Sequence, residues 1–164
     1  MKIQVNPIHL QFLNPLMQWK ILTVESLFSR SNYRGGYKAF HKILKKLERT
    51  GVTQGFRDMW SKKKYVYLTE LGSQLMYGGN ELVPFNNAIF HDARVAMVIE
   101  EVMTFSNFKN PRLEHEYRKS YLSSSDVYIP DALIQLQQGE KLLTLAIELE
   151  LSQKSQDRIR TKIG

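Results

Sequence analysis

The clearest pattern in the sequence lies at residues 37–49, YKAFHKILKKLER. Four apolar side chains recur there at helical spacing and form one stripe: Phe40, Ile43, Leu44 and Leu47. Lysines occupy the other faces, and Gly51 follows where a glycine commonly ends a helix. The pattern therefore predicts an amphipathic helix with one buried side and one basic side.

The residues around this helix predict a short series of further elements. Thr23 and Thr69 each precede a helical pattern, as N-capping threonines do. We expect, in order, a helical segment over 8–20 that Pro15 kinks or splits, a helix over 24–28, a turn over 29–36, the 37–49 helix, strands over 52–57 and 65–68, and a helix over 70–76. The loop between the two strands, residues 58–64, holds Trp60 and three consecutive lysines.

The charge of the chain is divided unevenly. Residues 1–80 hold 13 lysines and arginines against 4 acidic residues, net +9, whereas residues 81–164 hold 10 against 12, net −2. A basic half joined to a mildly acidic half indicates a polyanion-binding module attached to a second module. The alternative is a solvated basic surface that has no partner.

The segment LKKLERTGV, followed by KYVYLTELG, resembles the corresponding part of many bacterial winged-helix proteins. In those proteins a recognition helix ends in a leucine-rich turn and a glycine, and a basic hairpin, the wing, follows. The resemblance implies a winged helix-turn-helix domain over residues 1–79 that binds double-stranded DNA. A helix fits the major groove, and a basic wing reaches neighbouring phosphates or the minor groove.

The expected DNA contacts fall into two groups. The turn and the helix start, where base edges are usually contacted, hold Ser31, Asn32, Tyr33, Arg34 and Lys38. The helix body and the wing hold cations expected at phosphates, which position a protein without reading sequence: Lys42, Lys45, Lys46, Lys62, Lys63 and Lys64. Solvation of each lysine and helix packing of Tyr33 are the alternatives. Trp60 has little core to join in the wing, unless it packs on the second half.

Residues 80–164 are expected to form a small α/β domain. We expect a helix over 86–105, with His91-Asp92 near its start as a polar cap or an interdomain contact. We expect strands over 113–121, 132–137 and 142–151, a hairpin turn at Gln138-Gly139, and a final helix over 153–163. Strand alternation would place Glu148 and Glu150 on one face, about 7 Å apart. Like charges this close need a compensating cation or partner.

The order of helix, strand, Pro-Asp strand, Glu-x-Glu strand and helix resembles the PD-(D/E)xK nuclease core. The resemblance implies Asp131 and Glu148 as ligands of magnesium, with metal-assisted hydrolysis of a phosphodiester as the chemistry. Glu150 stands at the family's lysine position, and Lys154 lies one helical turn further on. The candidate catalytic residues are therefore Asp131, Glu148, Glu150 and Lys154. The alternative is a nuclease-like fold used for assembly, without a cofactor, in which basic side chains such as Arg118 compensate the carboxylates.

The whole arrangement resembles the replication-relaxation family of plasmid and conjugative-element proteins. The residues that carry this are Pro130-Asp131-Ala132 and the run IELELSQKS at 147–155. The resemblance implies a duplex DNA-binding accessory protein of a mobile genetic element, acting in plasmid mobilisation, replication or transposition, with other DNA-processing proteins or a second copy as partners. Two further hypotheses stay open: a metal-dependent DNA endonuclease targeted by a winged helix, and a transcriptional regulator.

The composition favours a cytoplasmic protein that does not enter a membrane. The chain has no cysteine, as proteins of reducing compartments often have none. No stretch reaches the ~18 apolar residues of a membrane span. Because the sequence stops inside a helical pattern, we expect either a short protein or a natural chain that continues beyond Gly164.

Overall fold

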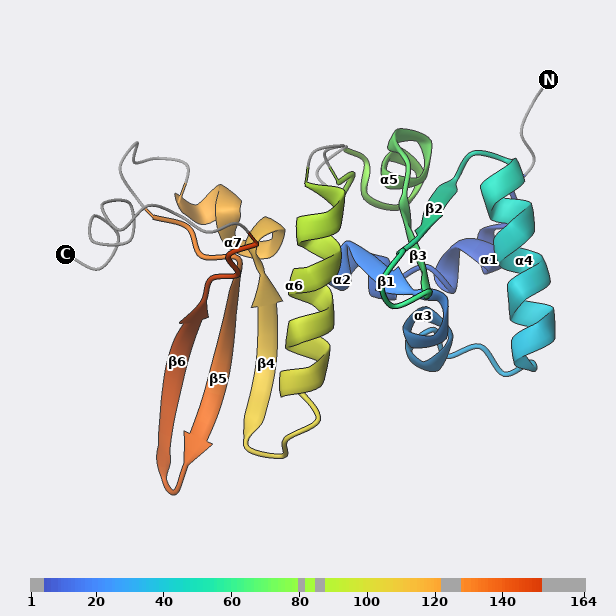
Figure 1. The fold of residues 1–164 in the computed structure, drawn as a ribbon. Helices are drawn as coiled ribbons and strands as arrows, with labels where there is room; N and C mark the ends of the chain where they lie inside the picture. Colours follow the sequence, from blue (N-terminus) through green and yellow to red (C-terminus); the bar gives the residue numbers. More distant parts are fainter. Residues whose placement is uncertain (1–4, 80–81, 85–87, 122–127, 152–164) are drawn as a thin grey trace.

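The computed structural model describes residues 5–79, 82–84, 88–121 and 128–151. They form a mixed α+β fold with two small antiparallel sheets (Figure 1). The elements follow in the order α1 (Pro7–Gln11), α2 (Pro15–Trp19), β1 (Ile21–Thr23), α3 (Val24–Arg30), α4 (Tyr37–Arg49), β2 (Thr53–Arg57), β3 (Lys64–Leu68), α5 (Glu70–Tyr77), α6 (Ile89–Val102), β4 (Phe108–Leu113), α7 (Glu114–Tyr121), β5 (Ala132–Gln138) and β6 (Lys141–Ile147).

The first sheet has the strand order β1-β3-β2, so the second strand of the β2–β3 hairpin is central. The register pairs Leu22 with Val66 on one side and Gly55 with Val66 on the other. Strand β1 was not predicted, because three residues are too few to show strand alternation. Its residues are all buried, so β1 joins the helices to the hairpin through the core.

The local signals of the first half are confirmed. Thr23 caps α3 by accepting a hydrogen bond from the Ser26 amide at 3.1 Å, and Thr69 caps α5 by accepting one from the Gly72 amide at 3.2 Å. Pro15 separates α1 from α2, and Gly51 follows α4 with a positive φ of 74°. That conformation suits glycine, which has no Cβ to clash.

The second sheet has the strand order β4-β5-β6, and it corrects two predictions. The strand expected over 113–121 is wrong: β4 ends at Leu113 and helix α7 begins at Glu114. Glu116 accepts a hydrogen bond from the Leu113 amide at 2.7 Å, and two acidic residues lie in the first turn. Both features stabilise a helix start, and the alternating polar pattern concealed them.

The strand expected over 142–151 ends at Ile147, so Glu148 and Glu150 do not share a strand face. Ala132, the first residue of β5, pairs with Ile147. The residues that would pair beyond Ile147 are Asp131 and Pro130, which precede Ala132. A proline has no amide hydrogen to donate to the ladder. The amide of Leu149 donates to the Asp131 carboxylate at 2.7 Å instead. The hairpin itself is confirmed, with its turn one residue later than expected, at Gly139-Glu140.

Helix α6 lies between the two sheets (Figure 1). It is shorter than the helix that the sequence predicted over 86–105. One cluster of buried apolar residues runs from the first half into α6 and onward to Leu113 and Ala132. Polar contacts reinforce this junction: Glu100 accepts from Ser26 at 3.0 Å and pairs with Arg30 at 3.1 Å. The proposed boundary near residue 79 stays a prediction. Within the described ranges, no helix is long and apolar enough to cross a membrane.

Candidate nucleic-acid interface

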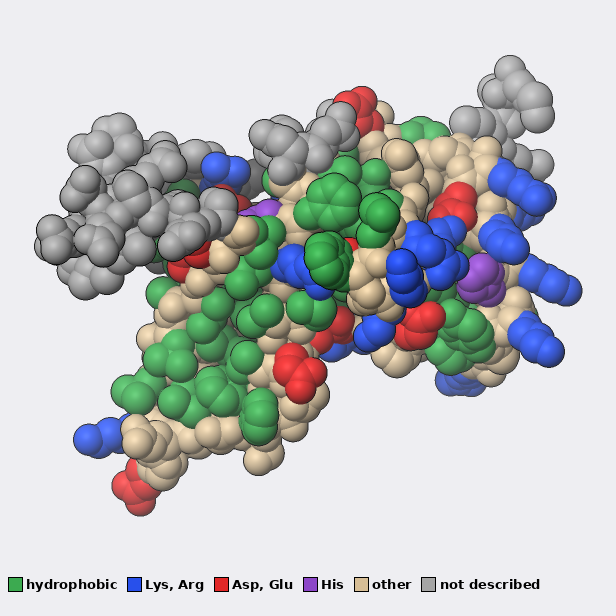
Figure 2. All heavy atoms as spheres, in the orientation of Figure 1, with side chains coloured by type: hydrophobic (Ala, Val, Ile, Leu, Met, Phe, Trp, Pro, Cys, Tyr) green, Lys and Arg blue, Asp and Glu red, His purple; other side chains and the backbone are tan. Residues whose placement is uncertain are grey.

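The outer face of α4 carries a row of exposed cations, which we name the basic stripe: Lys38, Lys42, Lys45, Lys46 and Arg49. At 3.6 residues per turn these five positions fall within roughly 100° of arc. The opposite face buries Phe40, Leu44 and Leu47 in the core. In Figure 2, Lys and Arg side chains gather along the edge where Figure 1 draws α4. The packing of the apolar face therefore orients the cations to solvent.

The residues expected at base edges, in the turn before α4 and at its start, differ in their exposure to solvent. Ser31 is buried, and its hydroxyl donates to the Phe28 carbonyl at 2.8 Å. Tyr33 is half-buried, with its ring 4.7 Å from that of Phe12, as the packing alternative expected. Asn32 and Arg34 are exposed. Among the residues expected at base edges, the accessible ones are therefore Asn32, Arg34 and Lys38.

Tyr37 anchors the first turn of α4. Its hydroxyl donates to Glu25 at 3.1 Å, and its ring meets that of Phe28 edge to face at 5.3 Å. Burial, with a smaller contribution from the Glu25 charge, raises the pKa of Tyr37. The phenol therefore stays protonated and keeps donating to Glu25, which ties the start of α4 to α3.

The three lysines of the β2–β3 hairpin have different surroundings. Lys62 and Lys63 are exposed. The Lys64 ammonium lies 2.5 Å from the carboxylate of Glu48, the single acidic residue in α4. This ion pair ties the hairpin to the helix, so Lys64 has an internal role besides the expected phosphate contact.

The tip of this hairpin is fastened to α6 through Asp58. The buried Asp58 carboxylate accepts from the amide and hydroxyl of Ser61, at 2.8 and 2.6 Å. One nitrogen of the Arg94 guanidinium lies 3.2 Å from both carboxylate oxygens. The Ser61 hydrogen bonds first, and the Arg94 charge after them, lower the pKa of Asp58 and keep it ionised. The hairpin is thereby held in one position relative to α6.

The carboxylates proposed as catalytic and metal-binding have structural contacts. Asp131 accepts from the Leu149 amide and lies 3.3 Å from the Nε2 atom of His91. Glu148 and Glu150 follow β6 and are exposed. Among the residues that the structure describes, no group of three or more His, Cys, Asp or Glu could hold a metal ion. Lys154 lies outside the described residues.

His91 and Asp92, which adjoin in the sequence, face different partners. Asp92 pairs with Lys20 of the segment after α2 at 2.9 Å, and His91 contacts Asp131 and the Leu149 carbonyl, the latter at 3.1 Å. The two residues therefore connect α6 to segments of both halves of the chain.

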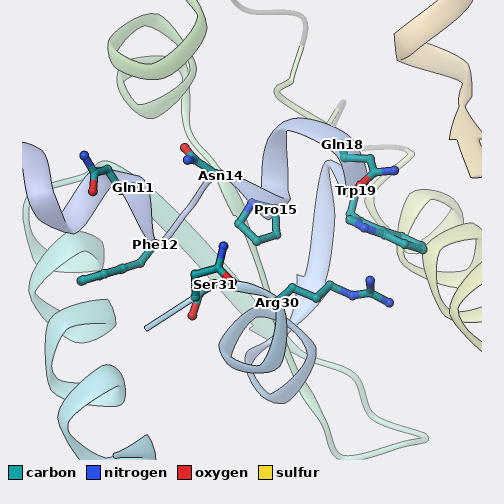
Figure 3. A pocket seen from close by; sticks show the side chains of 9 residues that line it. Gln11, Phe12, Asn14, Pro15, Gln18, Trp19, Arg30 and Ser31 are labelled. Carbon is teal, nitrogen blue, oxygen red and sulfur yellow. The ribbon is translucent and has the colours of Figure 1, made fainter. Parts of the chain in front are cut away.

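An open cavity of about 640 Å³ lies between the α1–α2 segment and the end of α3 (Figure 3). In it Arg30 extends toward Trp19, and its guanidinium lies 4.4 Å from the indole centroid. Because Arg30 also pairs with Glu100, its charge is compensated within the protein. Gln11, Asn14 and Gln18 add amide groups to the lining.

No protein-family model, curated protein or solved structure matches the chain. Two contributors escaped the sequence analysis. Arg49 lies three residues after Lys46 on the same helical face, a spacing that periodicity alone could have detected. The Asp58–Arg94 pair joins positions 36 residues apart, and no local signal indicates it.

Proposed function

We propose that this protein binds duplex DNA through α4, with α3 and α4 as a helix-turn-helix and the β2–β3 hairpin as its wing. The basic stripe is the observation that carries the proposal. A helix has the width to enter the major groove, and here five cations project from the side of α4 opposite its buried face. Lys62 and Lys63 extend the basic surface to the hairpin.

Within this proposal, position decides the role of each side chain. Arg34 and Lys38, at the helix start, are assigned to base edges, and the later cations of the stripe to phosphates. In keeping with the resemblance to the replication-relaxation family, we place this activity in an accessory protein of a mobile genetic element. The endonuclease and regulator hypotheses, which also involve DNA binding, stay predictions. No contact among the described residues favours either of them over the accessory role.

Salt dependence tests the proposal quantitatively. Each neutralised phosphate contributes about 0.9 to the slope of log affinity against log salt concentration. Six contacts, from the four later cations of the stripe and the two exposed wing lysines, would give a slope of roughly −5. The double variant Lys42→Ala/Lys46→Ala should lower the slope by up to about 2 on every duplex sequence. Fluorescence anisotropy with a labelled duplex measures this.

A matched control removes the same charge elsewhere. Lys109 and Lys141 are exposed on the second sheet, away from α4. The Lys109→Ala/Lys141→Ala variant should retain the wild-type slope and affinity. Absence of any duplex binding at low salt, or equal losses in the two double variants, would contradict the proposal.

A further inference from the structure

The tip of the β2–β3 hairpin presents two large apolar side chains to solvent. Met59 is 79% exposed and Trp60 is 88% exposed. Burial removes apolar surface from water and is favourable, so a tip shaped by stability alone would not display an indole. Exposed lysines follow directly at positions 62 and 63. An aromatic ring beside cations is the side-chain combination of sites that stack nucleobases.

The contacts around Asp58 hold this tip away from the core. The Asp58 amide donates to the Lys63 carbonyl at 2.9 Å, which closes the loop at its base. The Asp58 side chain, only 4% exposed, binds Ser61 inside the loop and Arg94 on α6. Trp60 therefore projects from a loop that is closed at its base and fixed to α6 through Asp58.

A shallow groove runs from this tip onto α6. It has a volume of about 350 Å³, and its walls are formed by Asp58, Met59, Trp60, Phe90, Arg94 and Leu151. Its aromatic groups come from two elements, Trp60 from the hairpin and Phe90 from α6. Phe90 is largely exposed, and its ring is held at one edge by Phe56, with centroids 5.1 Å apart. We name this hollow the wing-tip groove.

The chemistry of the wing-tip groove limits what can occupy it. Its walls are mostly apolar, the Asp58 charge is compensated by Arg94, and exposed cations lie beside it at Lys62 and Lys63. An occupant that complements these features has a flat apolar face attached to a negatively charged backbone. An unpaired nucleotide has both, because its base has a π face and its phosphate is anionic.

We propose that the wing-tip groove takes an unpaired nucleobase stacked on Trp60, so that the protein prefers duplex DNA interrupted by unpaired bases over fully paired duplex. This inference rests on the proposed function. In a fully paired duplex the bases stay inside the stack, and presenting one to a protein requires unpairing and unstacking. A base that is already unpaired enters without that cost, while the basic stripe binds the adjoining duplex.

The test compares three probes of one sequence by anisotropy: a paired duplex, the same duplex with a central three-nucleotide bubble, and the single strand. Stacking of one base on an aromatic ring corresponds to a gain of about fivefold or more in affinity. Wild-type protein should therefore bind the bubble at least about fivefold more tightly than the paired duplex. Trp60→Ala should remove that preference while the affinity and salt slope on paired duplex stay unchanged.

Intrinsic fluorescence provides a second measurement. The chain has two tryptophans, and Trp19 is only 3% exposed, so a change in emission on adding DNA reports Trp60. The bubble probe should quench this emission more than the paired duplex does. Trp60→Phe should keep most of the bubble preference, because a phenyl ring still stacks. Leu75→Ala, which truncates an exposed apolar side chain on α5, should leave both probes unaffected.

The outcomes separate the two proposals. Paired-duplex binding without a bubble preference, or a preference that survives in Trp60→Ala, would overturn the assignment of the groove and leave the duplex-binding proposal intact. Absence of binding to all three probes would overturn both. Tight binding of the single strand alone, insensitive to the Lys42→Ala/Lys46→Ala change, would keep the groove and reject the duplex role of α4.

Discussion

Gly72 allows a direct test of how α5 is seated against the hairpin. A Cβ added to Gly72 would lie 2.0 Å from the carbonyl oxygen of Val52, in the segment that leads into β2. Non-bonded heavy atoms prefer about 3.5 Å, so α5 and this segment would have to separate by roughly 1.5 Å. The Thr69 amide donates to the same carbonyl at 3.1 Å, and its hydroxyl donates to the Gly51 carbonyl at 2.5 Å. Gly72→Ala therefore strains the packing of α5 against the segment that leads into β2.

The size of the effect follows from opposing contributions. Alanine is favoured over glycine within a helix by about 1 kcal/mol. Overpacking against rigid backbone costs about 1–3 kcal/mol, and each weakened hydrogen bond about 1 kcal/mol. We expect Gly72→Ala to lower the free energy of unfolding by about 2 kcal/mol. For a chain of this size that is a fall in Tm of roughly 4–8 °C.

Thermal and urea denaturation followed by circular dichroism measure this change. Gln74→Ala is the matched control, because Gln74 is an exposed residue of the same helix and the substitution tests helix propensity alone. The control should be neutral or slightly stabilising. A Gly72→Ala protein as stable as wild type would refute the close approach of α5 to Val52.

Three further predictions concern the wing, the second half and the carboxylates. Lys63→Ala should weaken duplex binding more than Lys64→Ala, because Lys64 is engaged by Glu48; anisotropy at fixed salt compares them, and the reverse order would contradict the assignment. Burial lowers the pKa of His115 below its usual value, so the neutral form is favoured in the folded state and stability should fall as pH drops through about 6.5, the unfolded value. Urea midpoints at pH 7.5 and 5.5 measure this fall in stability, which should shrink in His115→Gln. An equal fall in wild type and His115→Gln would argue against His115 as its source. With Mn²⁺ we expect at most slow nicking of supercoiled plasmid, and robust cleavage that is lost in Glu148→Ala would promote the endonuclease hypothesis.

Short-range signals explain which parts of the fold could be predicted from sequence. The α4 stripe, the caps at Thr23 and Thr69, the break at Pro15 and the helix end at Gly51 depend on residues within one or two turns of each other. Each was predicted in place. The errors occurred where a local pattern was ambiguous: residues 113–121 alternate like a strand, but residues 114–121 form a helix.

The candidate interface was also predicted only in part. Periodicity predicted a basic face on α4, and the structure places Lys42, Lys45 and Lys46 in solvent. It did not predict that Ser31 would be buried with its hydroxyl bound to the Phe28 carbonyl. Packing of Tyr33 was expected only as an alternative, and its partner Phe12 lies in a distant segment. Exposure is a property of the folded chain, and composition does not report it.

The sequence alone determined α3, α4 and α5, the hairpin of β2 and β3, the charge difference between the halves and the basic side of α4, because helical period, capping chemistry and glycine φ are set by neighbouring residues. Tertiary structure alone decided that Lys64 pairs with Glu48, that Asp58 binds Arg94, and where β6 ends. These outcomes depend on which distant segments meet and in what register. One carboxylate can meet a metal, a guanidinium or a backbone amide, and only the arrangement of the whole chain selects among them.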